Sequence, residues 1–120
     1  MHLALRRALG RLVPHEPAAP SLLWSETTSA LRQLSWRGDI EDADAEEALS
    51  SLEQLTLVLA PAHDLAADAY ALSVRLGWAR TYDAEYVALA QRLGCPLLTV
   101  DARLARTAGR LVDLAPLESI

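Results

Sequence analysis

The sequence predicts a single α/β domain in which helices lie on both sides of a small parallel sheet, an α/β/α arrangement. Short apolar runs alternate with longer stretches whose apolar residues recur at helical spacing, which is the pattern of alternating strands and helices. The 120 residues also fit one domain, since a chain of that size buries roughly two thirds of its unfolded surface. We therefore expect one domain over residues 1–120.

The N-terminal half is predicted to be mostly helical. Leucines at helical spacing indicate an amphipathic helix over residues 3–12, and a proline-rich loop follows it, with a short extended piece before Pro20. Ser21 is suited to cap the N-terminus of a helix that runs to about Arg37, where a glycine ends it. The next helix, over residues 42–54, opens with acids that favour the positive end of the helix dipole.

The C-terminal half is predicted to alternate strands and helices. A short apolar run that ends in proline indicates a buried strand over residues 55–61, and the helix after it stops at Gly77. The remaining expected elements are a helix over 82–93 that ends at a glycine, a strand over 96–100, a short helix over 101–108 and an edge strand over 110–114. Only a few strands are visible, which is a small number for such a sheet.

Composition narrows the class of function. The single Cys95 excludes an internal disulfide, and the three histidines are too scattered for a zinc site, so we expect a reducing, cytoplasmic setting. Arginines interrupt the leucines of the N-terminus, a pattern of neither a signal peptide nor a membrane span, so we expect a soluble chain. The net charge of −5 argues against non-specific coating of nucleic acid but allows contact with RNA at one small patch.

Asp83 and Asp101 lie at the two ends of one helix-then-strand unit. The first turn of such a helix lies beside the carboxyl end of the strand that follows, and this is the edge where open parallel sheets bind ligands. Each aspartate has an ordinary alternative role, because Asp83 suits the positive end of its own helix and Asp101 can cap the next one. Together at one edge they would repel each other unless a cation lay between them, which favours a metal site.

Glu26 is the third candidate acid. It shares a helical face with Leu23 and Leu34, so we expect its carboxylate on or beside the buried stripe, where an acid needs a partner. The chain contains no lysine to provide one. The alternative is a boundary glutamate that reaches water. Glu85 points to a different helical face from Asp83, and we expect it either behind the site or at the surface.

Other polar and aromatic clusters have ordinary explanations. The acidic run at 39–47 is interpreted as a solvated helix face, because it lacks the glycine and ligand spacing of a calcium loop. Arg103 and Arg106 follow Asp101 and could contact RNA phosphates, although surface solubility explains them equally well. No nucleophile motif or glycine-rich phosphate loop is present. Packing in or at the edge of the core is expected for Trp24, Trp36 and Trp78.

Two stretches resemble the PIN-domain ribonucleases of the VapC toxin type: SLLWSETTSALRQLSWRGDI and TYDAEYVALAQRLGCPLLTVDARLAR. Members of that family carry a glutamate on one helix, a Tyr-Asp-Ala that opens a later helix, and a Thr-x-Asp at a strand end. All three motifs occur here in order, and the resemblance extends from about Leu9 onward. It implies a metal-dependent endoribonuclease, the toxin of a type II toxin–antitoxin pair.

The resemblance also implies a site and partners. Glu26, Asp83 and Asp101 match the catalytic acids that bind Mg²⁺ or Mn²⁺, and Thr99 matches a polar residue near the metal. The implied chemistry is metal-assisted hydrolysis of RNA. The implied partners are an RNA substrate, a cognate antitoxin and a second copy of the chain in a homodimer.

One part of the family pattern is not found. The pattern opens with a central strand that ends in an aspartate, and no such strand precedes Glu26. We expect either a chain shortened relative to its gene product or a degenerate member, with weak metal binding, poor RNA cleavage and low stability. The alternative function is an impaired PIN remnant that binds an antitoxin or a second copy.

Overall fold

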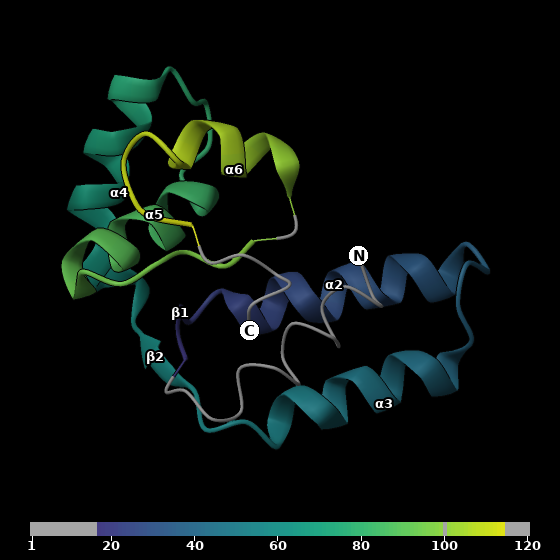
Figure 1. The fold of residues 1–120 in the computed structure, drawn as a ribbon. Coiled ribbons are helices and arrows are strands. Elements are labelled where there is room, and N and C mark those ends of the chain that lie inside the picture. The colour runs from purple at the N-terminus through teal and green to yellow at the C-terminus, as the bar shows by residue number, and fades with distance from the viewer. Residues whose placement is uncertain (1–16, 100, 115–120) are drawn as a thin grey trace.

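The computed structural model describes residues 17–99 and 101–114, in which five helices accompany one two-stranded sheet (Figure 1). The elements are β1 (Ala18–Pro20), α2 (Leu23–Trp36), α3 (Asp42–Glu53), β2 (Val58–Ala60), α4 (Ala62–Leu76), α5 (Tyr82–Leu93) and α6 (Ala102–Ala108). The helix expected over residues 3–12, and the question of a strand before it, lie outside the described residues. None of the described helices is long and apolar enough to cross a membrane.

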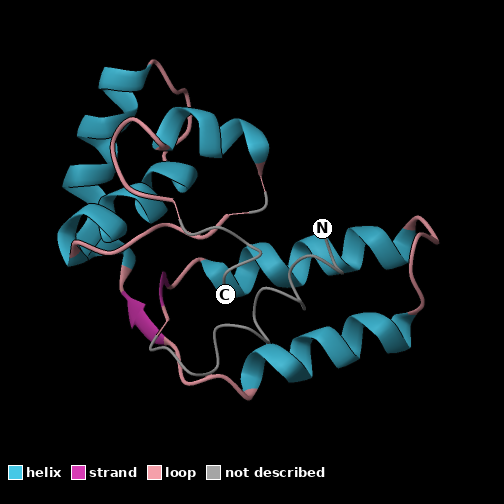
Figure 2. Ribbon diagram, in the orientation of Figure 1, coloured by secondary structure: helices cyan, strands magenta, loops and turns pink. Residues whose placement is uncertain are grey.

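The sheet is parallel, as expected, but very short. In β1 and β2, Ala18 lies opposite Val58 and Pro20 opposite Ala60, as the two magenta strands in Figure 2 show. The extended piece expected before Pro20 and the parallel α/β class are therefore confirmed. The strand expected over residues 55–61 is reduced to its last part, because β2 spans three residues.

The strands predicted over 96–100 and 110–114 are absent from the described residues, apart from one isolated parallel bridge between Leu97 and Leu114. The N–H groups of Leu111 and Val112 donate to the carbonyl oxygen of Ala108 at 2.8 and 2.9 Å, closing a turn after α6. Those donors are thereby used within the turn and cannot enter a sheet ladder. The prediction of a strand over 110–114 was wrong because bonds within the turn already satisfy these backbone N–H groups.

Helix ends follow the predicted signals with one exception. Gly77 and Gly94 end α4 and α5 with positive φ angles of 70° and 61°, a conformation that glycine adopts without strain. Asp101 caps α6, as its ordinary reading predicted. The expected cap at Ser21 is wrong: α2 starts after Leu22, without a side-chain cap. The N–H of Ser21 instead donates to the carbonyl of Ala60 at 2.9 Å, so Ser21 extends the pairing of the sheet.

The main core lies where α4, α5 and α6 meet, and α5 is its centre. Ala84 and Val87 on α5 and Leu65 on α4 are fully buried, and Trp78 packs against this cluster as expected. Because α5 buries residues around most of its circumference, it behaves as a central helix. Figure 1 shows α2 and α3 projecting side by side from this core, and each helix buries a leucine, Leu31 on α2 and Leu52 on α3.

We predict that Leu65→Ala lowers the free energy of unfolding by about 2–5 kcal/mol, because it opens a cavity in the α4–α5 core. Leu93→Ala is the matched control, since Leu93 is 52 % exposed at the end of α5 and its loss should cost about 0.5 kcal/mol. Urea denaturation measures both. Equal losses for the two variants would show that this core does not hold the fold.

Candidate acidic site at the junction of α2 and α5

A hydrogen bond between Tyr86 and Glu26 connects the projecting helix pair to the core. The hydroxyl of Tyr86 on α5 donates to Oε1 of Glu26 on α2 at 2.6 Å, across 60 residues of sequence. This length is typical of a hydroxyl that donates to an ionised carboxylate, which is a stronger bond than one between neutral groups. The bond therefore places Glu26 beside α5, the helix that carries Asp83.

The buried face of α2 is not the one that the sequence predicted. Glu26 is exposed, and the residues that α2 buries are Thr27 and Leu31, one position further along the helix. The expectation that Glu26 lies on or beside the buried stripe was wrong, and its exposure agrees with the alternative of a glutamate that reaches water. The reason is that α2 contacts α3 and buries Thr27 and Leu31 instead. The acid does have a partner, however. Sequence reasoning missed Tyr86, although its position three residues after Asp83 places both on one face of α5.

Three carboxylates act on the hydroxyl of Tyr86. Burial raises the pKa of Tyr86 far above its ordinary value of 10.0, and the hydrogen bond to Glu26 raises it further. The negative charges of Glu26, Glu85 and Asp83 add to this rise in the pKa, in that order. Because such a phenol keeps its proton at any physiological pH, Tyr86 serves as a permanent donor to Glu26.

Glu85 is buried, with an exposed fraction of 8 %. Its Oε1 has no hydrogen-bond partner and no contact with solvent. Burial raises the pKa of this carboxyl above its ordinary value of 4.5, and the charge of Glu26 raises it further. Of the two readings that the sequence left open for Glu85, the surface reading is wrong. The signal for burial was its position among the apolar residues of the central helix.

Asp101 has a local structural role. Its Oδ1 accepts hydrogen bonds from the backbone N–H groups of Arg103 and Leu104 at 2.9 and 3.1 Å, which caps α6. Its own backbone N–H donates to Oγ1 of Thr99 at 3.1 Å, so Thr99 stabilises the turn before the helix. Arg103 and Arg106 on α6 are exposed. Exposure is compatible with contact to RNA and with a role in solubility, so both alternatives stay open.

The arrangement gathers some of the predicted ligands but does not form a complete metal centre. Over residues 17–99 and 101–114, no group of three or more His, Cys, Asp or Glu side chains is placed to hold a metal ion. Glu26, Asp83 and Glu85 all act on Tyr86, whereas Asp101 has separate local partners. A metal site made of Glu26, Asp83 and Asp101 therefore stays a prediction. The unpartnered oxygen of Glu85 fits a divalent cation, because Mg²⁺ and Mn²⁺ prefer hard oxygen ligands.

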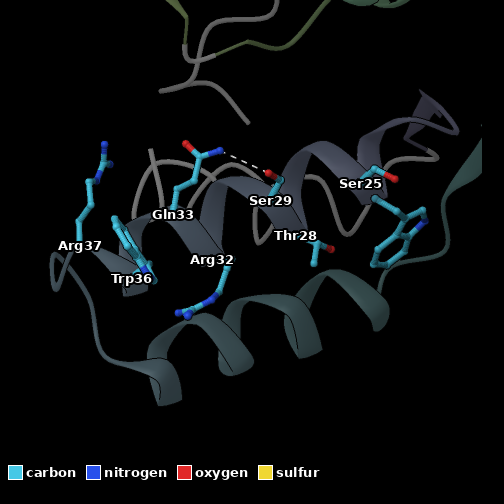
Figure 3. Close-up of a pocket in the computed structure, with 8 residues that line it drawn as sticks. Ser25, Thr28, Ser29, Arg32, Gln33, Trp36 and Arg37 are labelled. Carbon is cyan, nitrogen blue, oxygen red and sulfur yellow. Dashed lines mark hydrogen bonds between the residues drawn. The ribbon is translucent and has the colours of Figure 1, made fainter.

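A groove of about 830 Å³ runs along another face of α2, between Trp24 and Arg37. Figure 3 shows it with Ser29 and Gln33, whose side chains are hydrogen-bonded at 3.3 Å. None of the candidate acids lines this groove. Trp36 lines it and is 74 % exposed, so the expectation that Trp36 packs in or at the edge of the core was wrong. The reason is that the C-terminal half of α2 extends beyond the α4–α6 core.

Tyr86→Phe is expected to lower the free energy of unfolding by about 1 kcal/mol, through loss of the bond between α5 and α2. The loss stays moderate because exposed Glu26 can bind water instead. Tyr70→Phe on α4 is the matched control, because Tyr70 is 68 % exposed and its change should cost less than about 0.5 kcal/mol. Chemical denaturation in EDTA checks the difference, and identical losses would contradict a stabilising role for the bond.

The pH dependence of stability should report the burial of Glu85. Its pKa is raised on folding, so between the unfolded value of 4.5 and the higher folded value the native state holds a proton that the unfolded state releases. Stability from this group is therefore lost as the pH rises through that window. In EDTA, the free energy of unfolding of Glu85→Gln minus that of the wild type should increase from pH 5 to pH 8. Parallel pH curves would contradict this.

The comparisons with known proteins agree on one family. The family model of the PIN domain matches residues 1–110. VapC ribonuclease Mb0985 of Mycobacterium bovis is 38% identical over 88 residues, which cover 73% of this chain and 67% of the relative. Two proteins of Mycobacterium tuberculosis are also similar. Ribonuclease VapC3 is 36% identical over 103 residues, or 86% of this chain and 71% of the relative. Ribonuclease VapC1 is 40% identical over 91 residues, which cover 76% of this chain and 67% of the relative.

These matches confirm the resemblance that the helix glutamate, the Tyr-Asp-Ala and the Thr-x-Asp suggested. The family model covers the segment that carries Glu26, the α5 helix with Tyr86, and the two parallel strands. Because the family model matches residues 1–110 and these relatives are 36% to 40% identical to the matched parts of the chain, the chain belongs to the PIN-domain family.

Proposed function

We propose that this chain is a metal-dependent endoribonuclease that acts as the toxin of a type II toxin–antitoxin pair. Membership of the PIN-domain family and similarity to proteins named VapC ribonucleases support the reaction class. The observation that carries the proposal at the level of the site is the 2.6 Å bond from Tyr86 to Glu26. This bond brings a carboxylate from α2 to Tyr86 on α5, three residues after Asp83.

In this proposal Glu26, Asp83 and Asp101 hold one divalent cation, either Mg²⁺ or Mn²⁺, since hard oxygen ligands suit both. When bound, the cation supplies Lewis-acid stabilisation of the charge that develops on the phosphate during hydrolysis. The protein's own groups set the geometry. Tyr86 holds Oε1 of Glu26, which leaves the second oxygen of that carboxylate available.

The turn before α6 positions the third acid. Thr99 accepts from the backbone N–H of Asp101, and Asp101 in turn caps α6, so its carboxylate has a defined orientation. One oxygen of that carboxylate carries both capping bonds. Arg103 and Arg106 are exposed on the same helix and would contact the phosphates that flank the scissile bond.

The proposed partners are RNA, a cognate antitoxin and a second copy of this chain, and the proposed site of action is the cytoplasm. Support comes from the VapC resemblance and from large apolar side chains that the described surface leaves exposed. Tyr70 and Val74, exposed by 68 % and 67 %, lie one turn apart on α4 and give that helix an apolar exposed face. Surfaces of this kind are common where one protein binds another.

A second candidate function is an impaired PIN protein that binds its partners without cleaving RNA. The observation that favours it is the separation of roles among the acids, because Asp101 is used as a helix cap and the described residues hold no preformed three-acid group. Such a protein would bind an antitoxin or a second copy and show no metal-dependent cleavage.

Substitution of the proposed ligands separates the two candidates. Glu26→Gln and Asp83→Asn should each lower the rate of Mn²⁺-dependent RNA cleavage by at least about a hundredfold, because each removes a charged ligand. Glu46→Gln and Asp42→Asn are matched controls on α3, exposed and of the same type, and should leave the rate unchanged. The measurement is cleavage of a labelled RNA with purified protein, with and without EDTA.

If both site variants cleave RNA as fast as the wild type, the proposed acidic site is overturned. Absence of any Mn²⁺-dependent cleavage by a folded wild-type chain would favour the impaired protein.

A further inference from the structure

The buried carboxylate of Glu85 is not explained by the fold. Among the described residues its Oε1 is a buried side-chain oxygen without a hydrogen-bond partner, and the whole residue is 8 % exposed. An unpaired carboxylate in the interior is costly, because burial removes its hydration and nothing replaces it. A residue that destabilises the fold in this way is often retained for a function.

Among the described residues, no arginine bonds to this oxygen. The chain contains no lysine, and Arg92, which shares helix α5 with Glu85, is committed to α4. There it donates to the carboxylate of Asp68 at 3.0 Å and to the carbonyl oxygen of Asp64 at 2.7 Å. A small cation from solution can neutralise Glu85 where these side chains do not.

Glu85 also lies where the other acids meet. It directly precedes Tyr86, the residue that binds Glu26. The charge of Glu26 acts on Glu85, and the charges of both act on the hydroxyl of Tyr86. The orphaned oxygen therefore belongs to the residue directly before Tyr86, whose hydroxyl joins α5 to Glu26 on α2.

We propose that Glu85 is a further ligand of the divalent cation, and that it would hold the ion together with Glu26. The inference rests on the proposed function, and it adds to that site a ligand that neither the sequence motifs nor the matched family description assigns. A hard oxygen without a partner is the type of donor that Mg²⁺ and Mn²⁺ take up.

The geometry assigns different parts to the neighbouring groups. Glu26 keeps its Oε1 on Tyr86 and offers its other oxygen, while Glu85 offers an oxygen that makes no bond at all. A cation between them removes the repulsion between the two carboxylates and the cost of the buried charge together. Binding should therefore stabilise the fold as well as complete the site.

Titration of the metal-free chain with MnCl₂ in a calorimeter tests this without any measurement of activity. Glu85→Gln should weaken the Mn²⁺ dissociation constant at least about tenfold and abolish the rise in melting temperature that Mn²⁺ gives the wild type. Glu46→Gln is the control for net charge, because Glu46 is exposed on α3, and it should bind Mn²⁺ like the wild type. Melts in EDTA establish that each variant is folded.

A second variant covers the case in which Glu85→Gln does not fold. Glu85→Met has about the same size, suits the apolar surroundings and carries no oxygen, and it should lose Mn²⁺ binding in the same way. Unchanged Mn²⁺ affinity in either folded variant would overturn the inference. If Glu26→Gln and Asp83→Asn lose Mn²⁺ while the Glu85 variants keep it, only the inference fails. If all four keep it, the proposed acidic site fails as well.

Discussion

The hydroxyl of Tyr86, bonded to Glu26 at 2.6 Å, is the contact on which the arrangement of this molecule depends. It joins two parts that bury their apolar residues separately, the α4–α6 core and the α2–α3 pair. Packing alone would leave the projecting pair with few contacts to the core. A charged hydrogen bond between exposed Glu26 and half-buried Tyr86 ties α2 to α5, in addition to the contact of α5 with β1, and brings negative charge from two helices to one hydroxyl.

Electrostatics at this junction oppose stability. Glu26, Asp83 and Glu85 bring negative charge to one hydroxyl in a chain whose net charge is already −5 and which has no lysine. The pKa values of Glu85 and Tyr86 are raised first by burial and then by the neighbouring carboxylates, because both effects disfavour the ionised form of each group. A divalent cation at the proposed acidic site would relieve this repulsion.

Local signals in the sequence predicted most of the helical part of the fold. The ends of α4 and α5 follow from glycines that adopt positive φ, and the start of α6 follows from the cap at Asp101. The strands were predicted less well. A strand exists only through its partner, and in the last segment the N–H groups of Leu111 and Val112 bond back to α6 instead of to a neighbouring strand. Helices satisfy their backbone internally, so their limits are readable from the chain.

The sequence by itself determined the family, the class of fold and three candidate acids, because motifs, spacing and composition are carried by the chain alone. Only the tertiary structure decided that Glu26 is exposed and bound to Tyr86, that Glu85 is buried without a partner, and that Trp36 is open to solvent. These outcomes depend on how helices rotate against one another. A shift of one residue in the buried face of α2 is invisible in helical periodicity, yet it changes which side chains meet.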